Sequence, residues 1–190
     1  MKSVIFAGVG GQGVILASKV LMETAMAAGY DVRESEVHGM AQRGGSVECT
    51  VRFGDKIHSP LIPKAGADFV VAFEELEAMR KLEFLKEDGT LIVNRMRIDP
   101  TPVINGDMTY PADIEAWIIE HVNNQLFVDT NPVLKELGNP RALNIVMLGI
   151  LSQYLDFPES AWHDAIRSQV KEQFIDLNIA AFTKGRQLVR

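Results

Sequence analysis

The chain has 190 residues, of which 47% are apolar and 23% are charged. This composition is typical of a single globular domain and argues against disordered and fibrous architectures. The 19 basic and 25 acidic residues leave a net charge of -6, which argues against the broad cationic surface that nucleic-acid binding requires.

The sequence argues against a metal site and against a membrane-spanning segment. Cys49 is the single cysteine, so the chain has no intrachain disulfide and too few thiols for its own iron–sulfur cluster or cysteine-rich zinc site. The four histidines are not spaced as metal ligands. The apolar run at residues 3–7 is interrupted by glycines before it reaches the length of a signal segment, and residues 145–151 are too few to cross a bilayer. We expect a cytoplasmic protein without membrane contact.

The first third of the chain predicts a strand, a turn and a helix, followed by two more strands. Residues 3–7 form a continuous apolar run that ends in glycines, and apolar residues then recur at helical spacing from Val14 until Gly29. Residues 30–37 predict a strand at an edge of the sheet, because Glu34 and Glu36 would face water. Residues 46–53 alternate apolar and polar side chains, which predicts a strand buried on one face.

The remainder alternates strands with helices and ends in helices. Residues 69–73 predict a central parallel strand, residues 74–85 a helix, and residues 90–93 another strand. Prolines between residues 96 and 111 predict a loop or small hairpin, and residues 126–129 a last strand. Helices are expected at residues 131–138, 140–155 and 158–189, the last with a break near residues 176–178. Together these elements predict one α/β domain over residues 1–190, with three layers, a mostly parallel central sheet, a Rossmann-like start and a helical C-terminal part.

A glycine-rich motif, Gly8-Val9-Gly10-Gly11-Gln12-Gly13, lies between the first strand and the first helix. Its G-x-G-x-x-G spacing lets a phosphate approach backbone N–H groups at the positive end of a helix. Alternatively, these glycines serve only a tight turn and close packing of helix against sheet. Glu34 and Glu36 follow by the interval expected of a ribose-binding carboxylate, so a dinucleotide ligand remains open.

The loop over residues 38–45 combines several groups suited to binding. His38, Gln42 and Arg43 precede the glycine pair Gly44-Gly45, at the carboxyl end of a predicted strand, where open α/β sheets bind ligands. Consecutive glycine N–H groups form an anion nest, and an arginine adds a bidentate contact to phosphate or carboxylate. The alternative is a shaped turn in which Arg43 pairs with Glu36 or Glu48.

Three residues outside these motifs have structural interpretations. Cys49 lies on the apolar face of its strand, which predicts a buried and unreactive thiol. Asn144 lies within a very apolar helix, so its amide must be satisfied by a backbone bond or at an interface. Gly149 costs that helix about 1 kcal/mol relative to alanine, and we expect a close helix crossing to compensate.

Three segments together resemble a known family: the glycine motif at residues 8–13, His38-Gly39-Met40-Ala41-Gln42-Arg43-Gly44-Gly45-Ser46-Val47, and Asn144-Ile145-Val146-Met147-Leu148-Gly149. They are similar to the gamma-type subunits of 2-oxoacid:ferredoxin oxidoreductases, and most of all to the small subunit of the indolepyruvate enzymes. The likeness extends over about residues 3–182. The Gln42-Arg43-Gly44-Gly45 block makes it far more specific than the glycine turn alone.

The resemblance implies that the chain is a subunit of a complex that converts a 2-oxoacid and coenzyme A into acyl-CoA, carbon dioxide and reduced ferredoxin. Thiamine diphosphate and iron–sulfur clusters are expected in the larger partner subunit or subunits, and an indolepyruvate-type enzyme would act on arylpyruvates. The resemblance also implies that this chain contributes to the coenzyme A side of the active site. The candidate binding residues are Gly10, Gly11, Gln12, Gly13, Gln42, Arg43, Gly44 and Gly45, with His38 as a candidate near the reacting thioester.

Two other functions remain open from the sequence. One is a free-standing NAD- or FAD-binding protein that uses Glu34 or Glu36 on the ribose. The other is a scaffold that binds no small molecule. The isolated chain could also self-associate through the surface that a partner would cover.

Overall fold

A computed structural model describes residues 1–39 and 45–189 of the chain. Six strands form one sheet: β1 (Lys2–Val9), β2 (Asp31–His38), β3 (Ser46–Gly54), β4 (Ala67–Ala72), β5 (Leu85–Asn94) and β6 (Gln125–Val128). Eight α-helices accompany it in the described residues: α1 (Val14–Ala27), α2 (Glu75–Lys81), α3 (Thr101–Ile104), α4 (Ile114–His121), α5 (Asn131–Glu136), α6 (Leu143–Leu151), α7 (Glu159–Gln169) and α8 (Ile175–Gln187). No helix in these two ranges is long and apolar enough to span a membrane.

The sheet has the strand order β2-β3-β1-β4-β5-β6. β1, β4, β5 and β6 are parallel to one another, whereas β3 is antiparallel to both β1 and β2. Five of the six strands therefore point the same way, which confirms the predicted mostly parallel sheet. β2 lies at the edge, as its charged residues indicated. β3 pairs antiparallel with β2 along nearly the full length of both strands, from Asp31 opposite Gly54 to His38 opposite Val47.

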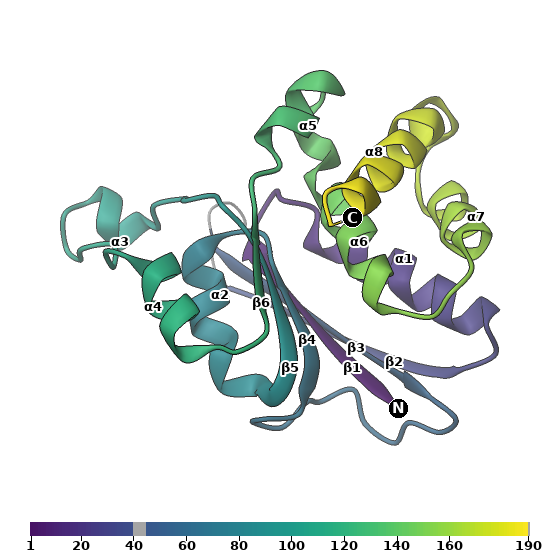
Figure 1. Cartoon of the computed structure of the whole chain (residues 1–190), viewed down its shortest axis with the longest axis horizontal. Helices are drawn as coiled ribbons and strands as arrows, with labels where there is room; N and C mark the ends of the chain where they lie inside the picture. The colour runs from purple at the N-terminus through teal and green to yellow at the C-terminus, as the bar shows by residue number, and fades with distance from the viewer. Residues whose placement is uncertain (40–44, 190) are drawn as a thin grey trace.

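Helices cover both faces of the sheet, which confirms the three layers (Figure 1). α1, α6, α7 and α8 lie over one face, and α2 and α4 over the other. The strict alternation of β1 divides its side chains between two cores. Val4 and Phe6 belong to the core under α1 and α6, while Ile5 packs with Ala78 and Ile118 on the opposite face.

A close crossing joins α6 and α8 and confirms the interpretation of Gly149. A Cβ on Gly149 would lie 2.2 Å from the carbonyl oxygen of Phe182, and a Cβ on Gly185 would lie 2.0 Å from that of Val146. The two glycines thus let the backbones of the helices touch. This contact compensates the low helix propensity of glycine.

Two of the predicted helical regions, residues 74–85 and residues 158–189, are interrupted or end elsewhere than expected. The helix expected from Glu74 ends at Lys81 and continues as a 3-10 turn at Leu82–Phe84. The break in the last helical region lies at Val170 and Lys171, which are both extended, and the predicted break at residues 176–178 is wrong. Asp176 instead occupies the first turn of α8, where an acidic side chain stabilises a helix.

Two short helices were not predicted. α3 lies within the segment expected to be a loop or hairpin. α4 has Ile114 and Ile118 buried four positions apart, a spacing too short in sequence to signal a helix by itself.

Candidate functional site

The carboxyl edge of the sheet brings distant parts of the chain together. β1, β4, β5 and β6 are parallel, so their last residues meet at this edge. β3 begins there, with Ser46 opposite Val9. The glycine turn, the ends of the strands and Gly45, which precedes β3, therefore share the edge at which open α/β sheets bind ligands.

The glycine turn, residues 8–13, requires glycine at particular positions. Gly11 has a φ of 102° and Gly13 a φ of 79°, which side chains other than glycine rarely adopt. A Cβ on Gly8 would lie 2.8 Å from Gln12 Oε1 and 3.2 Å from the Cβ of Phe73. Local geometry and close packing therefore account for glycine at positions 8, 11 and 13.

The turn also leaves hydrogen-bond donors at the start of α1. Gly13 caps this helix without a side-chain hydrogen bond, and no acidic residue lies in the first turn. Gly10 N–H donates to the carbonyl oxygen of Gly45 at 2.9 Å. In contrast, the N–H groups of Gly11, Gly13 and Val14 have no acceptor within the described ranges. Such N–H groups at the positive end of a helix suit an anion.

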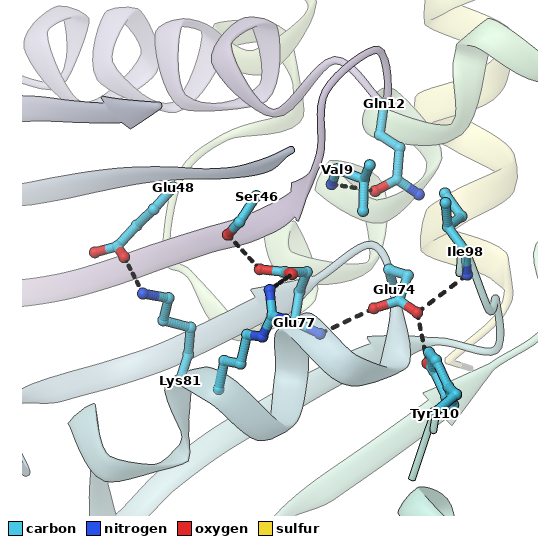
Figure 2. A network of polar contacts seen from close by, with 10 residues as sticks. Val9, Gln12, Ser46, Glu48, Glu74, Glu77, Lys81, Ile98 and Tyr110 are labelled. Carbon is cyan, nitrogen blue, oxygen red and sulfur yellow. Dashed lines mark hydrogen bonds and ion pairs between the residues drawn. The ribbon is translucent and has the colours of Figure 1, made fainter. Parts of the chain in front are cut away.

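Gln12 fastens the glycine turn to the neighbouring strands. Its Oε1 accepts a hydrogen bond from Val9 N–H at 2.7 Å (Figure 2). Its Nε2 donates to the carbonyl oxygen of Phe73 at 3.0 Å and to Met96 Sδ at 3.3 Å. The side chain thus connects residues at or just after the ends of β1, β4 and β5. These contacts make Gln12 a residue that positions the turn.

Glu74 forms the centre of a buried polar network below the turn (Figure 2). Its side chain is 1% exposed. It accepts hydrogen bonds from the backbone N–H of Glu77 at 2.9 Å, from Ile98 N–H at 3.1 Å and from the Tyr110 hydroxyl at 2.5 Å. Burial and the neighbouring Glu74 carboxylate raise the pKa of the Tyr110 phenol. Glu74 therefore caps α2 and anchors the segment that follows β5.

A second carboxylate, that of Glu77, connects α2 to the start of β3. It is 3% exposed and accepts hydrogen bonds from the Ser46 hydroxyl at 2.5 Å and from Arg80 at 2.7 Å. One helical turn later, Lys81 pairs with Glu48 of the same strand (Figure 2). These contacts fix the start of β3 against α2.

Two buried carboxamides complete the edge. Asn94 is 1% exposed; it donates to the carbonyl oxygen of Phe73 at 3.3 Å and accepts from the Thr130 hydroxyl at 2.8 Å. Asn144 donates through Nδ2 to the carbonyl oxygen of Gly13 at 3.2 Å. The Asn144 nitrogen thus has the backbone partner that the structural interpretation expects, and this partner belongs to the glycine turn. Its Oδ1 is buried without a hydrogen-bond partner among the described residues.

A cavity of about 260 Å³ lies between the turn, α2 and the segment after β5. It is lined by Val9, Gly45, Ser46, Glu74, Leu76, Glu77, Arg80, Ile98, Pro100, Thr101 and Pro102. The two carboxylates among them disfavour a phosphate inside this cavity. The groups suited to an anion are the free N–H groups on the α1 side of the turn.

The structure brings part of the predicted site together. Gly10, Gly11, Gln12 and Gly13 form one turn, and Gly45 contacts it through Gly10. Gln42, Arg43 and Gly44 lie outside the described residues. The backbone of His38 pairs with Val47, which in turn lies opposite Gly8.

Sequence reasoning missed Glu74, Glu77, Asn94 and Tyr110. Glu74 and Asn94 could have been noticed, because each comes at or just after the carboxyl end of a predicted parallel strand. Tyr110 carried no such signal, since it reaches Glu74 from a segment 36 residues further along the chain.

The sheet order does not favour the dinucleotide alternative. In a dinucleotide fold, the strand carrying the ribose-binding carboxylate lies beside the first strand, but here β3 lies between β1 and β2. Glu34 aligns through Val51 with Val4, near the start of β1 and away from the glycine turn. Its carboxylate accepts a hydrogen bond from Ser18 at 2.5 Å. Neither the position nor the contacts of Glu34 suit a nucleotide at the turn.

A family model and a curated relative each match nearly the whole chain. The family model described as pyruvate ferredoxin/flavodoxin oxidoreductase matches residues 3–188. Indolepyruvate oxidoreductase subunit IorB of Pyrococcus horikoshii is 39% identical over 188 residues, which cover 96% of this chain and 93% of the relative.

Solved structures of low sequence identity share the fold. Pyruvate oxidoreductase subunit PORC from Thermotoga maritima has a TM-score of 0.73 at 24% identity and covers 98% of this chain and 96% of its own. The 2-oxoglutarate:ferredoxin oxidoreductase from Magnetococcus marinus, solved with 2-oxoglutarate, coenzyme A and succinyl-CoA, has a TM-score of 0.74 at 19% identity. The match covers 98% of this chain but 30% of that longer one. The resemblance inferred from the three sequence segments is confirmed, and the chain belongs to the pyruvate ferredoxin/flavodoxin oxidoreductase family.

Proposed function

We propose that this chain is the small subunit of a cytoplasmic 2-oxoacid:ferredoxin oxidoreductase complex of the indolepyruvate type. In the proposed reaction the bond between the carboxylate and the carbonyl carbon of the oxoacid breaks, which releases carbon dioxide. The thiol sulfur of coenzyme A bonds to the acyl carbon and gives up its proton, and the electron pair passes to ferredoxin in single-electron steps. The observation that carries this proposal is the similarity to subunit IorB over nearly the full length of both chains.

The redox centres of such a complex are assigned to its larger subunit. The single cysteine, Cys49, is fully buried, and burial raises the pKa of its thiol to about 12. An iron–sulfur cluster needs several accessible thiolates, so the residues of this chain do not fit one. Thiamine diphosphate, which would stabilise the carbanion formed on decarboxylation, is likewise assigned to the larger subunit.

The part assigned to this chain is the binding of coenzyme A phosphate. The free N–H groups of Gly11, Gly13 and Val14 lie at the start of a 14-residue helix without an acidic first turn, which suits a phosphate. Arg43, Gly44 and Gly45 would add a guanidinium and an anion nest. His38 and Gln42 are proposed to face the thioester, and Gln12 to hold the turn in place.

Anaerobic affinity purification of this chain from its host tests the assignment to a complex. We expect a larger, brown subunit containing thiamine diphosphate to co-purify, and the preparation to reduce ferredoxin with indolepyruvate faster than with pyruvate or 2-oxoglutarate. A chain that purifies alone and carries its own redox group would contradict the proposal.

Calorimetric titration of the reconstituted complex with coenzyme A tests the anion site. Replacing Arg43 with alanine removes a charged phosphate contact, so we expect about a tenfold or greater loss of affinity. Arg167→Ala is the matched control, because Arg167 is exposed on α7 and pairs with Asp164. Equal affinity of wild type and Arg43→Ala would refute a role for this residue in coenzyme A binding.

A further inference from the structure

A second hollow, of about 310 Å³, opens on the helical layer of the molecule. Its lining comes from α1, from the 3-10 turn before α6 and the residue preceding it, and from the end of α7 through the first turn of α8: Leu16, Asn139, Arg141, Ala142, Gln169, Val170, Lys171, Phe174, Leu177 and Asn178. It shares no lining residue with the cavity at the sheet edge. It is therefore a separate feature of the surface.

The walls of the hollow are held by short polar contacts. Asn139 Oδ1 accepts a hydrogen bond from Arg141 N–H at 2.9 Å, which fixes the turn that carries this arginine. Asn178 Nδ2 donates to the carbonyl oxygen of Phe174 at 2.8 Å, which fixes the start of α8. The shape is thus set by the chain's own contacts before any partner binds.

The rim carries two cations without partners. The side chains of Arg141 and Lys171 form no hydrogen bond or ion pair with any residue that the structure describes. Other cations of the helical layer do pair, as Lys184 does with Glu136 and Arg167 with Asp164. No aspartate or glutamate lines the hollow, although the chain as a whole has a net charge of -6. The lining therefore carries two unpaired positive charges and no negative one, although Glu23 accepts a hydrogen bond from the lining residue Gln169.

The floor is apolar and partly open to water. Phe174 is 41% exposed, and Leu16, Val170 and Leu177 lie beside it in the hollow. The volume is at the lower end of the about 300–1,000 Å³ typical of pockets that enclose small ligands. A small molecule here would leave the exposed rim in water, whereas a polypeptide would cover both floor and rim.

We propose that this hollow is a docking site for a segment of the larger partner subunit in which an apolar side chain is flanked by carboxylates. The apolar side chain would fill the floor beside Phe174, and the carboxylates would pair with Arg141 and Lys171. This inference rests on the proposed function, since it needs a partner subunit, but it assigns the contact to one surface and one kind of sequence.

Titration of the separately purified larger subunit with variants of this chain tests the docking site. We expect Lys171→Glu to weaken the affinity about fivefold and the double change Arg141→Glu/Lys171→Glu to weaken it about 30-fold, because each reversal replaces attraction with repulsion. The dependence of affinity on salt should also become shallower in the double variant. Lys56→Glu is the matched control, because Lys56 is likewise exposed and unpaired among the described residues.

A photo-crosslinking residue at position 174 identifies the segment directly. We expect crosslinks to a stretch of the larger subunit with an aspartate or glutamate within about four residues of the crosslinked side chain, a spacing within reach across one helical turn. Crosslinks to a segment without acidic residues, or none, would overturn the proposal.

The outcomes separate the two proposals. If the wild-type chain binds no larger subunit, the proposed function fails. If the complex forms and the charge reversals leave its affinity unchanged, only the docking site fails. The same holds if the reversals change only the saturation of activity by coenzyme A or oxoacid, because the hollow would then take a small anion.

Discussion

Asn144 in α6 donates a hydrogen bond to the carbonyl oxygen of Gly13, a residue 131 positions earlier that caps α1. The carboxamide occupies the space that a side chain on Gly13 would need, since a Cβ there would lie 2.7 Å from Asn144 Nδ2. The glycine turn is thus shaped from two directions. Gln12 holds it to the strands, and Asn144 holds it to the helical layer.

The contact between Asn144 and Gly13 predicts a large loss of stability for Gly13→Ala. Alanine would be strained at a φ of 79° and would collide with Asn144, so we expect the free energy of unfolding to fall by about 2–4 kcal/mol. Gly106→Ala is the matched control, because Gly106 has a φ of 82° but no atom within 4 Å of its added Cβ; its cost should be about 1 kcal/mol. Chemical denaturation measures both. Equal losses at the two positions would refute the packing argument.

The close crossing of α6 and α8 predicts that Gly149→Ala destabilises the chain, although alanine has the higher helix propensity. Propensity alone favours Gly149→Ala by about 1 kcal/mol. Because the added Cβ would lie 2.2 Å from a backbone oxygen of α8, we instead expect a destabilisation of about 3 kcal/mol or more, since backbone cannot move aside as a flexible side chain can. Thermal unfolding shows whether Gly149→Ala stabilises or destabilises the chain, and a raised melting temperature would contradict the close crossing.

The Glu74 network predicts a moderate cost for Tyr110→Phe. The change removes one of three donors to a buried carboxylate and leaves the aromatic ring in place. We expect a loss of about 1–3 kcal/mol in the free energy of unfolding. Tyr154→Phe serves as a control, because no hydrogen bond of the Tyr154 hydroxyl is seen within the described part of the chain. If both variants lose the same stability, the Tyr110 hydroxyl contributes nothing to the network.

The raised pKa of Glu75 predicts that replacing this residue with glutamine stabilises the folded chain at neutral pH. Burial, and next the charge of Glu74, raise the pKa of Glu75 in the folded chain. The unfolded chain therefore loses this proton at lower pH, so ionisation of Glu75 favours unfolding as pH rises from its unfolded to its folded pKa.

Chemical denaturation of Glu75→Gln and of wild type across pH 3–8 tests whether ionisation of Glu75 lowers the free energy of unfolding. We expect the variant to be the more stable at pH 7, because glutamine has no charge to desolvate. The difference should disappear below about pH 4, where the carboxyl group is protonated in both states. A variant that is less stable at pH 7 would show that the Glu75 charge is stabilising in the folded chain.

The sequence was sufficient for features that depend on neighbours along the chain. The strand, glycine turn and helix at the start follow from local hydrophobic periodicity and from glycine geometry, and both hold in the structure. The same is true of the alternating β3 strand and of the buried thiol of Cys49. Gly149 indicated a crossing because a glycine inside an apolar helix needs compensation from outside it.

Tertiary structure decided how those parts meet. The sequence did not reveal that β3 would run antiparallel between β1 and β2, since strand order depends on which edges pair in space. Nor did it reveal that Gln12 bonds to Phe73, 61 residues away, or that Glu74 gathers donors from α2, from Ile98 and from Tyr110. Hydrogen bonds between distant segments leave no periodic trace in the sequence, because only the folded sheet brings their donors and acceptors to one edge.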